Sequence, residues 1–423
     1  MFNGLSLEQA PPISVVLRFF ITLPIFGIVL ALLMIAAPDE LLTLGHWYSL
    51  GAIHLLFLGI VSMGMIGALF QMQSVLGGAP IQNPHRHSLI IHALLSVGIT
   101  ALVGAFVWNI PVLFMVASIA LGGALIYFAT IMLPLLFGTL SHDTLKGMRF
   151  SLLSLFLTAT LGVIMAVSYG SGVISDHHIT VRTVHYSFGL MGWVAALIIY
   201  VAFQVVEMFY VTTSYSDWCK TNVKRIIGSM LAFKIVGLVG NLPFVWVFDT
   251  VVAVLLTGFV VTTLKRLKTR KRRVGDVSIW FWFAGLGLLM IAIITYGAFL
   301  VLGLSSLVSV ALIAFALFAL AILLGMMGKI VPFLVWFHLN AAGFMETPIM
   351  STIISTKRLK LTFWFFITTA LLALMAPWYP WLLRGAGIVA LGLFTVIATN
   401  LIMATRLYAH VLKTGTKFSF DIP

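Results

Sequence analysis

The sequence predicts an all-α polytopic membrane helix bundle, and three observations lead to this prediction. Apolar residues make up 61% of the 423 residues, charged residues make up 8%, and the mean hydropathy is +1.15. Soluble domains carry about 25% charged residues. About twelve stretches are apolar enough and long enough to cross a bilayer, which takes about 20 residues. Short connections join them, so we expect residues 1–423 to form a single transmembrane domain.

The expected spans follow one another along almost the whole chain. The seventh and eighth are divided only at Asn241-Leu242-Pro243, where proline interrupts a helix. The N-terminus lacks a charged region and a small-residue cleavage site, so no removable signal peptide is expected. The single Cys219 excludes an internal disulfide. The twelve spans are 13–37, 48–72, 87–108, 111–138, 147–170, 181–206, 224–241, 244–264, 278–303, 306–338, 361–380 and 385–411.

The net charge of +13 does not indicate a nucleic-acid partner, because the basic residues lie in alternate loops. Only Arg182 and Arg384 occur in the expected outer connections, whereas the run Lys265–Arg273 lies in an inner loop. This bias predicts that both termini are inside and that the protein is integral to a bacterial inner membrane. The lipid bilayer is then its main partner, and the basic run is an anchor beside anionic lipid. A specific lipid or partner site at that run is the alternative.

Four histidines lie within expected spans, where a polar side chain is costly and indicates function. His54 and His185 share the outer half of the bilayer, while His92 and His338 approach the inner interface. Neutral imidazole is a good axial ligand of heme iron, so His54 and His185 are the first candidates for one or two hemes b. His92 and His338 are weaker candidates, because a histidine near the interface costs little. Hydrogen-bonded packing is the alternative for each.

Glycines and arginines accompany the two outer histidines. Gly59, Gly189 and Gly192 lie about one turn from a histidine and would leave room for a flat macrocycle, although small residues also permit close helix packing. Arg182, three residues before His185, and Arg384 could clamp heme propionates, because a guanidinium matches a carboxylate. Contacts with lipid headgroups would explain both arginines as well.

These residues resemble subunit I of the heme-copper oxidases, a superfamily that includes the nitric oxide reductases. That family has about twelve helices with both termini inside and holds its hemes in the outer half of the bilayer. Its second helix carries an axial histidine near the outer end, which His54 resembles. Residues 185–193, His-Tyr-Ser-Phe-Gly-Leu-Met-Gly-Trp, resemble the family pattern His-x-His-x-Gly-x-x-Gly-Trp. In the family the first histidine of this pattern holds the high-spin heme and the second holds the low-spin heme.

The chain departs from the family at its copper site. Ser187 replaces the second histidine, and the motif lies on the sixth expected span rather than the tenth. No span contains an adjacent histidine pair or a His-Pro-Glu motif, so copper is not expected. The resemblance therefore implies an oxidase relative without an oxygen-reducing binuclear centre. Such a protein would serve electron transfer or redox and nitric oxide handling, with a quinone or cytochrome as electron partner. Whether it is catalytic stays open.

A secondary transporter for a metal ion or heme is the competing function, and a non-catalytic subunit needing a partner is a third. The second and sixth spans resemble an internal repeat, which is common among transporters. Lys234 and Lys329 lie in apolar sequence, and Asp249 could pair with Lys234. Lys329 could serve a proton or quinone path, or bind the carbonyl freed by Pro332. His177 and His178 are expected to be solvated loop histidines rather than a surface metal site. Five methionines are expected to fill the core rather than to bind monovalent copper: Met63, Met65, Met72, Met326 and Met327.

Overall fold

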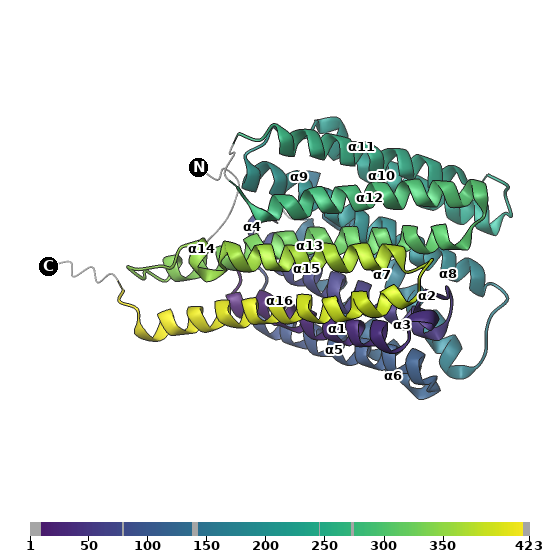
Figure 1. The fold of residues 1–423 in the computed structure, drawn as a ribbon, viewed down its shortest axis with the longest axis horizontal. Coiled ribbons are helices and arrows are strands. Elements are labelled where there is room, and N and C mark those ends of the chain that lie inside the picture. The colour runs from purple at the N-terminus through teal and green to yellow at the C-terminus, as the bar shows by residue number, and fades with distance from the viewer. Residues whose placement is uncertain (1–9, 78–79, 138–142, 245, 272–274, 418–423) are drawn as a thin grey trace.

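The chain folds into a bundle of long helices (Figure 1). The computed structural model describes residues 10–77, 80–137, 143–244, 246–271 and 275–417. The first nine residues, together with Arg272 and Arg273 of the basic run, lie outside these ranges. Within them every regular element is a helix, apart from one isolated bridge between Phe344 and Lys417. Eleven described helices are long and apolar enough to cross a membrane, which confirms the predicted polytopic all-α class.

The twelve long helices or helix series form three successive groups of four, each group in the same order. The first group consists of α1 (Ile13–Ala36), the series α3 (Trp47–His54), η2 (Leu55–Ser62) and α4 (Met63–Gly77), then α5 (Pro84–Trp108) and α6 (Pro111–Leu136). The second consists of α7 (Asp143–Ser171), the series α8 (His178–Ser187), η3 (Phe188–Ala195) and α9 (Ala196–Tyr210), then α10 (Asp217–Val239) and α11 (Trp246–Lys268). The third consists of α12 (Val277–Leu302), α13 (Ser305–Ala341), α15 (Thr356–Met375) and α16 (Trp381–Thr414). Short helices α2 (Pro38–Leu42) and α14 (Met350–Ile353) join some of them.

Equivalent helix boundaries of the first two groups are separated by a constant number of residues. The π-helices η2 and η3 start at Leu55 and Phe188, which are 133 residues apart. The same interval separates the starts of α5 and α10, at Pro84 and Asp217. The internal repeat that the sequence indicated between the second and sixth spans therefore extends over four helices. A third group follows it, so the chain is built as three units rather than two halves.

Three glycines at the same interval support this relationship. Gly59, Gly192 and Gly325 lie in the second helix series of the three groups. A Cβ atom at Gly59 would meet Phe26 of α1, one at Gly192 would meet Ser154 of α7, and one at Gly325 would meet Phe281 of α12. In each group the glycine thus permits close contact between the first and second helices.

The three groups close into a ring around their second helices. α6 packs on α7, α11 on α12, and α16 returns to α1. The second helix series are the most enclosed of the spans, with 72%, 72% and 67% of their apolar stretch buried. The core of the bundle therefore lies along an axis between α4, α9 and α13, and the helices that carry His54 and His185 line this axis.

The predicted seventh span differs from the other long helices in its polarity. It corresponds to α10, which forms a helix separate from α11, as the Asn241-Leu242-Pro243 break predicts. Lys224, Arg225 and Lys234 make α10 more charged than the eleven apolar spans. α2, α3 and α8 lie at the opposite end of the bundle from α14 and the end of α16 (Figure 1). We call the latter end the basic end, because most of the basic loops lie there.

Candidate histidine-pair site

The structure brings His54 and His185 together. Their ring centroids lie 6.2 Å apart with the ring planes inclined by 31°. His54 is the last residue of α3, and His185 lies in the last turn of α8. The sequence indicated only that the two share a depth, whereas the ring closure of the bundle makes them neighbours across its axis.

Each histidine has the same hydrogen-bond arrangement. Nδ1 of His54 lies 2.7 Å from the carbonyl oxygen of Leu50, and Nδ1 of His185 lies 2.9 Å from that of Thr158. A carbonyl oxygen can only accept, so Nδ1 carries the proton in both rings. In this tautomer Nε2 keeps its lone pair for a ligand, and metal-binding histidines commonly donate Nδ1–H to a carbonyl in the same way.

A π-helix follows each histidine directly. η2 begins one residue after His54, and η3 begins three residues after His185. π-Helices are rare and often occur at functional sites. Nε1 of Trp193 in η3 donates a 2.9 Å hydrogen bond to Oγ of Ser62 in η2, and both side chains are buried. The two segments behind the histidines are thus joined to each other. Sequence reasoning missed both π-helices, and only the common 133-residue register could have indicated them.

One phenylalanine ring packs directly on His54. Phe106 of α5 stacks on the His54 ring with centroids 5.3 Å apart. Phe106 also contacts Phe114 and Tyr169, so an aromatic cluster extends from the site. The Tyr169 hydroxyl lies 2.8 Å from Nε2 of His178, which therefore has a protein partner rather than only solvent.

The predicted role of the glycines as space for a macrocycle is wrong for this conformation. The space beside Gly59 holds Phe26, that beside Gly189 holds the Thr158 methyl group, and that beside Gly192 holds Ser154. These glycines permit close helix packing, which was the alternative. Gly162 of α7 is the glycine next to the site, because a Cβ there would lie 3.1 Å from Cε1 of His185.

Ser187 is the residue of the second group that is equivalent to His54 of the first group. The interval of 133 residues pairs His54 with Ser187 rather than with His185. Ser187 is buried, and its Oγ donates a 2.7 Å hydrogen bond to the carbonyl of Thr183 in its own helix. The two histidines are therefore not equivalent positions of the repeat, although they meet at one site.

His92 and His338 lie in different environments. Nε2 of His92 is 2.7 Å from Oγ1 of Thr22. The Thr22 hydroxyl already donates to the carbonyl of Arg18, so His92 must donate its Nε2 proton to Thr22. This hydrogen bond occupies Nε2 and favours the packing role for His92. His338 lies beside Phe337, and its buried Nε2 has no hydrogen-bond partner among the described residues.

The two predicted propionate arginines lie on different parts of the bundle. Arg182 is exposed on α8, one turn before His185. Arg384 is exposed in the first turn of α16, which packs against α1 and α15. Arg182 thus shares a helix with a site histidine, whereas Arg384 does not.

Lys234 and Asp249 form an ion pair between α10 and α11, as the sequence predicted. Nζ of Lys234 lies 3.3 Å from Oδ1 of Asp249, with side-chain exposures of 8% and 16%. The ammonium also faces the ring of Phe248 at 4.2 Å and that of Tyr186 at 5.8 Å. Through Tyr186, the ion pair also contacts α8, the helix that carries His185.

Lys329 has a different partner from the one expected. It pairs with Asp276 rather than with the carbonyl freed by Pro332. Asp276 also accepts hydrogen bonds from the backbone and hydroxyl of Ser278 at the start of α12. Ser278 in turn contacts the hydroxyl of Tyr210 at 2.8 Å. A polar network therefore connects α9, α12 and α13 at the basic end, where the lysine would otherwise be an isolated charge.

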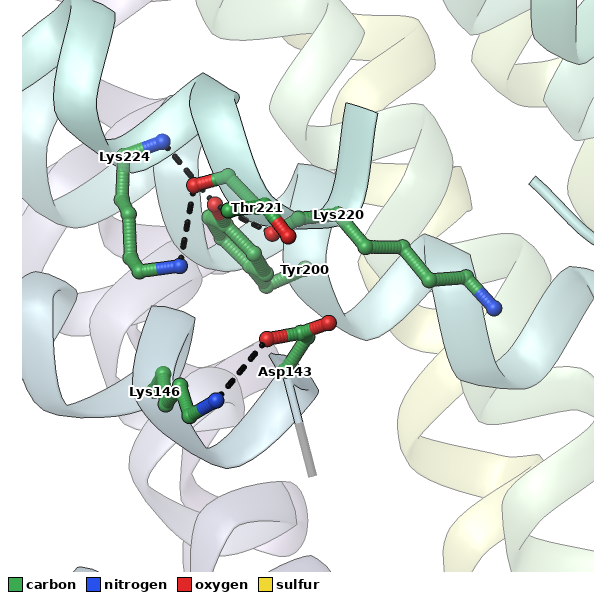
Figure 2. A network of polar contacts seen from close by, with 6 residues as sticks. All are labelled: Asp143, Lys146, Tyr200, Lys220, Thr221 and Lys224. Carbon is green, nitrogen blue, oxygen red and sulfur yellow. Dashed lines mark hydrogen bonds and ion pairs between the residues drawn. The ribbon is translucent and has the colours of Figure 1, made fainter. Parts of the chain in front are cut away.

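A second polar network at the basic end joins α9 to α10 (Figure 2). The Tyr200 hydroxyl donates to the carbonyl of Lys220 at 3.1 Å and accepts from the Lys224 amide at 2.9 Å. Gly147 of α7 makes room for the Tyr200 ring, because a Cβ there would overlap that ring. Lys146 and Asp143 form a more exposed ion pair at 3.2 Å nearby. This network joins α9 to the beginnings of α7 and α10, which belong to the same group.

The histidine pair contains few ligands for a bare metal ion. Within the described residues no group of three or more His, Cys, Asp or Glu side chains is arranged to hold one.

Neither a protein-family model nor a curated protein sequence matches this chain.

Proposed function

We propose that this chain is a heme-binding integral membrane protein in which His54 and His185 are the axial ligands of a heme b. The observation that supports this most strongly is the two-histidine donor set with both Nε2 atoms available. A bare zinc or copper ion in a protein usually takes three or four protein ligands. Heme iron takes only axial ligands, because the macrocycle supplies the other four nitrogens. Two histidines alone therefore suit heme better than a bare ion.

The chain's own residues would hold and orient the group. The carbonyls of Leu50 and Thr158 accept from Nδ1–H, which fixes the tautomer and the rotation of both imidazoles. Arg182, on the helix of His185, is the first candidate to bind a propionate, and Arg384 is the second. Entry of the macrocycle requires the aromatic ring of Phe106 and its neighbours to move, since close packing fills the space beside the glycines. A bound heme would supply a one-electron iron couple for electron transfer or for redox and nitric oxide handling.

A relationship to subunit I of the heme-copper oxidases belongs to the same proposal. It is supported by the order of the helices and by the two histidines meeting between the second and sixth helix series. Ser187, where the family has its second histidine, supports a member without an oxygen-reducing binuclear centre. The basic loops support an orientation with both termini inside, in a bacterial inner membrane. A quinone or cytochrome would then be the electron partner.

Heme content tests the proposal. The protein is purified after expression with ample heme, and heme b is extracted and counted per chain. One or two equivalents are expected. A protein that folds but contains no heme under these conditions contradicts the proposal.

Two ion pairs, one largely buried and one partly exposed, favour a secondary transporter as the second candidate. Lys234 with Asp249 and Lys329 with Asp276 place charge inside the bundle, as ion-coupled transporters do. Uptake of a metal ion or heme into proteoliposomes, by protein without a tightly held chromophore, would favour this function. Co-purification of a second chain in mild detergent would favour a subunit role instead.

A further inference from the structure

A cavity of about 70 Å³ lies on the axis of the bundle, between the second helices of the three groups. Met65 and Met72 of α4 line it, and so do Ile198 and Val205 of α9, which are their equivalents 133 residues later. Met326 of α13 completes the wall. The cavity is therefore lined by equivalent positions of the first two groups.

The wall of this cavity is apolar throughout. Its lining consists of aliphatic, methionine and aromatic side chains from α1, η2, α4, α9, α12 and α13. A buried water needs 2–4 polar partners, and such apolar cavities stay dry. A bare cation is also disfavoured, because no carboxylate lines the cavity and an unpaired buried charge is very costly. The methionines thus act as adaptable walls rather than as ligands of monovalent copper.

The volume of the cavity limits the size of the molecule that it can bind. A dry cavity of about 150 Å³ binds benzene or xenon. A volume near 70 Å³ excludes a quinone ring but admits xenon or a diatomic molecule. The lining begins at Val61, the seventh residue of η2, and at Leu197, the second residue of α9. It therefore starts where the two π-helices end, on the same helices as His54 and His185.

We propose that this cavity binds one small neutral apolar molecule of the size of a diatomic gas. Apolar gases dissolve in a bilayer, so such a molecule would be available around the helix bundle. The binding needs only the cavity and does not depend on heme at the histidine pair.

Xenon is the probe that tests this site. Ala202 of α9 is fully buried and lines the cavity, so Ala202→Leu should fill it and weaken xenon binding at least tenfold. Ala232→Leu adds the same atoms at an exposed position of α10 and should leave binding unchanged. The measurement is a titration with xenon of the protein in detergent, in which a saturable change of the ¹²⁹Xe chemical shift reports binding.

A second variant keeps the test decisive if Ala202→Leu does not fold. Met326→Ala enlarges the cavity and should bind xenon at least twofold more tightly. Repeating the titration on His54→Ala protein separates this site from the heme proposal, because xenon binding should persist there. Absence of saturable binding in the unmodified protein, or equal binding by the filled and enlarged cavities, would overturn the inference.

Discussion

Trp193 and Ser62 join the two π-helices through one buried hydrogen bond of 2.9 Å. The bond links the segment after His54 to the segment after His185, so it ties together the backbone that supports both imidazoles. The histidine pair therefore depends on contacts one to two turns away from the rings themselves.

Removing one partner of this bond should destabilise the bundle. Ser62→Ala leaves a buried indole N–H without an acceptor, at a cost of about 1–3 kcal/mol. When Ser62 is already alanine, Trp193→Phe should lower the free energy of unfolding by less than it does in the unmodified protein, because it then removes the unpaired indole N–H. Thermal unfolding in detergent of the two single variants and the double variant measures the coupling. Strictly additive effects would mean that the bond does not link the π-helices energetically.

The Lys234–Asp249 pair should be far more sensitive than a surface pair. Lys234→Met leaves Asp249 uncompensated in a buried position, and breaking a buried pair typically costs about 3–5 kcal/mol. Lys146→Met is the matched control, since the Lys146–Asp143 pair is more exposed and should contribute about 0–1 kcal/mol. Chemical denaturation of both variants makes the comparison. Equal losses of stability would contradict the buried position of Lys234.

Gly147 should tolerate no side chain. Gly147→Ala places a methyl group on the Tyr200 ring and should lower the midpoint of thermal unfolding clearly. Gly258→Ala in α11 is the control, because nothing lies within 4 Å of its Cβ position. There alanine should be neutral or should stabilise the helix by up to about 1 kcal/mol. The same loss at both glycines would argue against the contact between α7 and α9.

Arg182 should slow the loss of heme. If its guanidinium binds a propionate, Arg182→Gln removes a charged hydrogen bond of about 1.5–3 kcal/mol, which corresponds to roughly a tenfold to hundredfold faster loss. Lys357→Gln, at the basic end, should leave the rate unchanged. Transfer of heme to an excess of apomyoglobin measures both rates. A rate unaffected by Arg182→Gln would assign that arginine to lipid headgroups.

The long helices could be predicted because each depends on local composition. Runs of apolar residues define the spans, and polar breaks such as Asn241-Leu242-Pro243 divide them. The Lys234–Asp249 pair could also be predicted, since a lone buried acid and a nearby lysine have few other partners. The depth of His54 and His185 followed from topology alone.

Contacts between distant helices could not be predicted in this way. The salt bridge between Lys329 and Asp276 and the occupation of the Gly59 space by Phe26 both depend on how helices pack sideways. The π-helices could not be predicted from composition, because a short apolar run like η2 or η3 fits an α-helix equally well. The three-unit architecture emerges only when helix boundaries are compared across the whole chain.

The optical spectrum of the purified protein, with its histidine variants, tests the central claim most directly. We expect a Soret band with the sharp α and β bands of a reduced six-coordinate heme b. His54→Ala or His185→Ala should abolish or shift these bands, whereas His92→Ala should not, because Nε2 of His92 is bonded to Thr22. A protein without a Soret band, or a spectrum that neither His54→Ala nor His185→Ala alters, would contradict heme ligation by this pair.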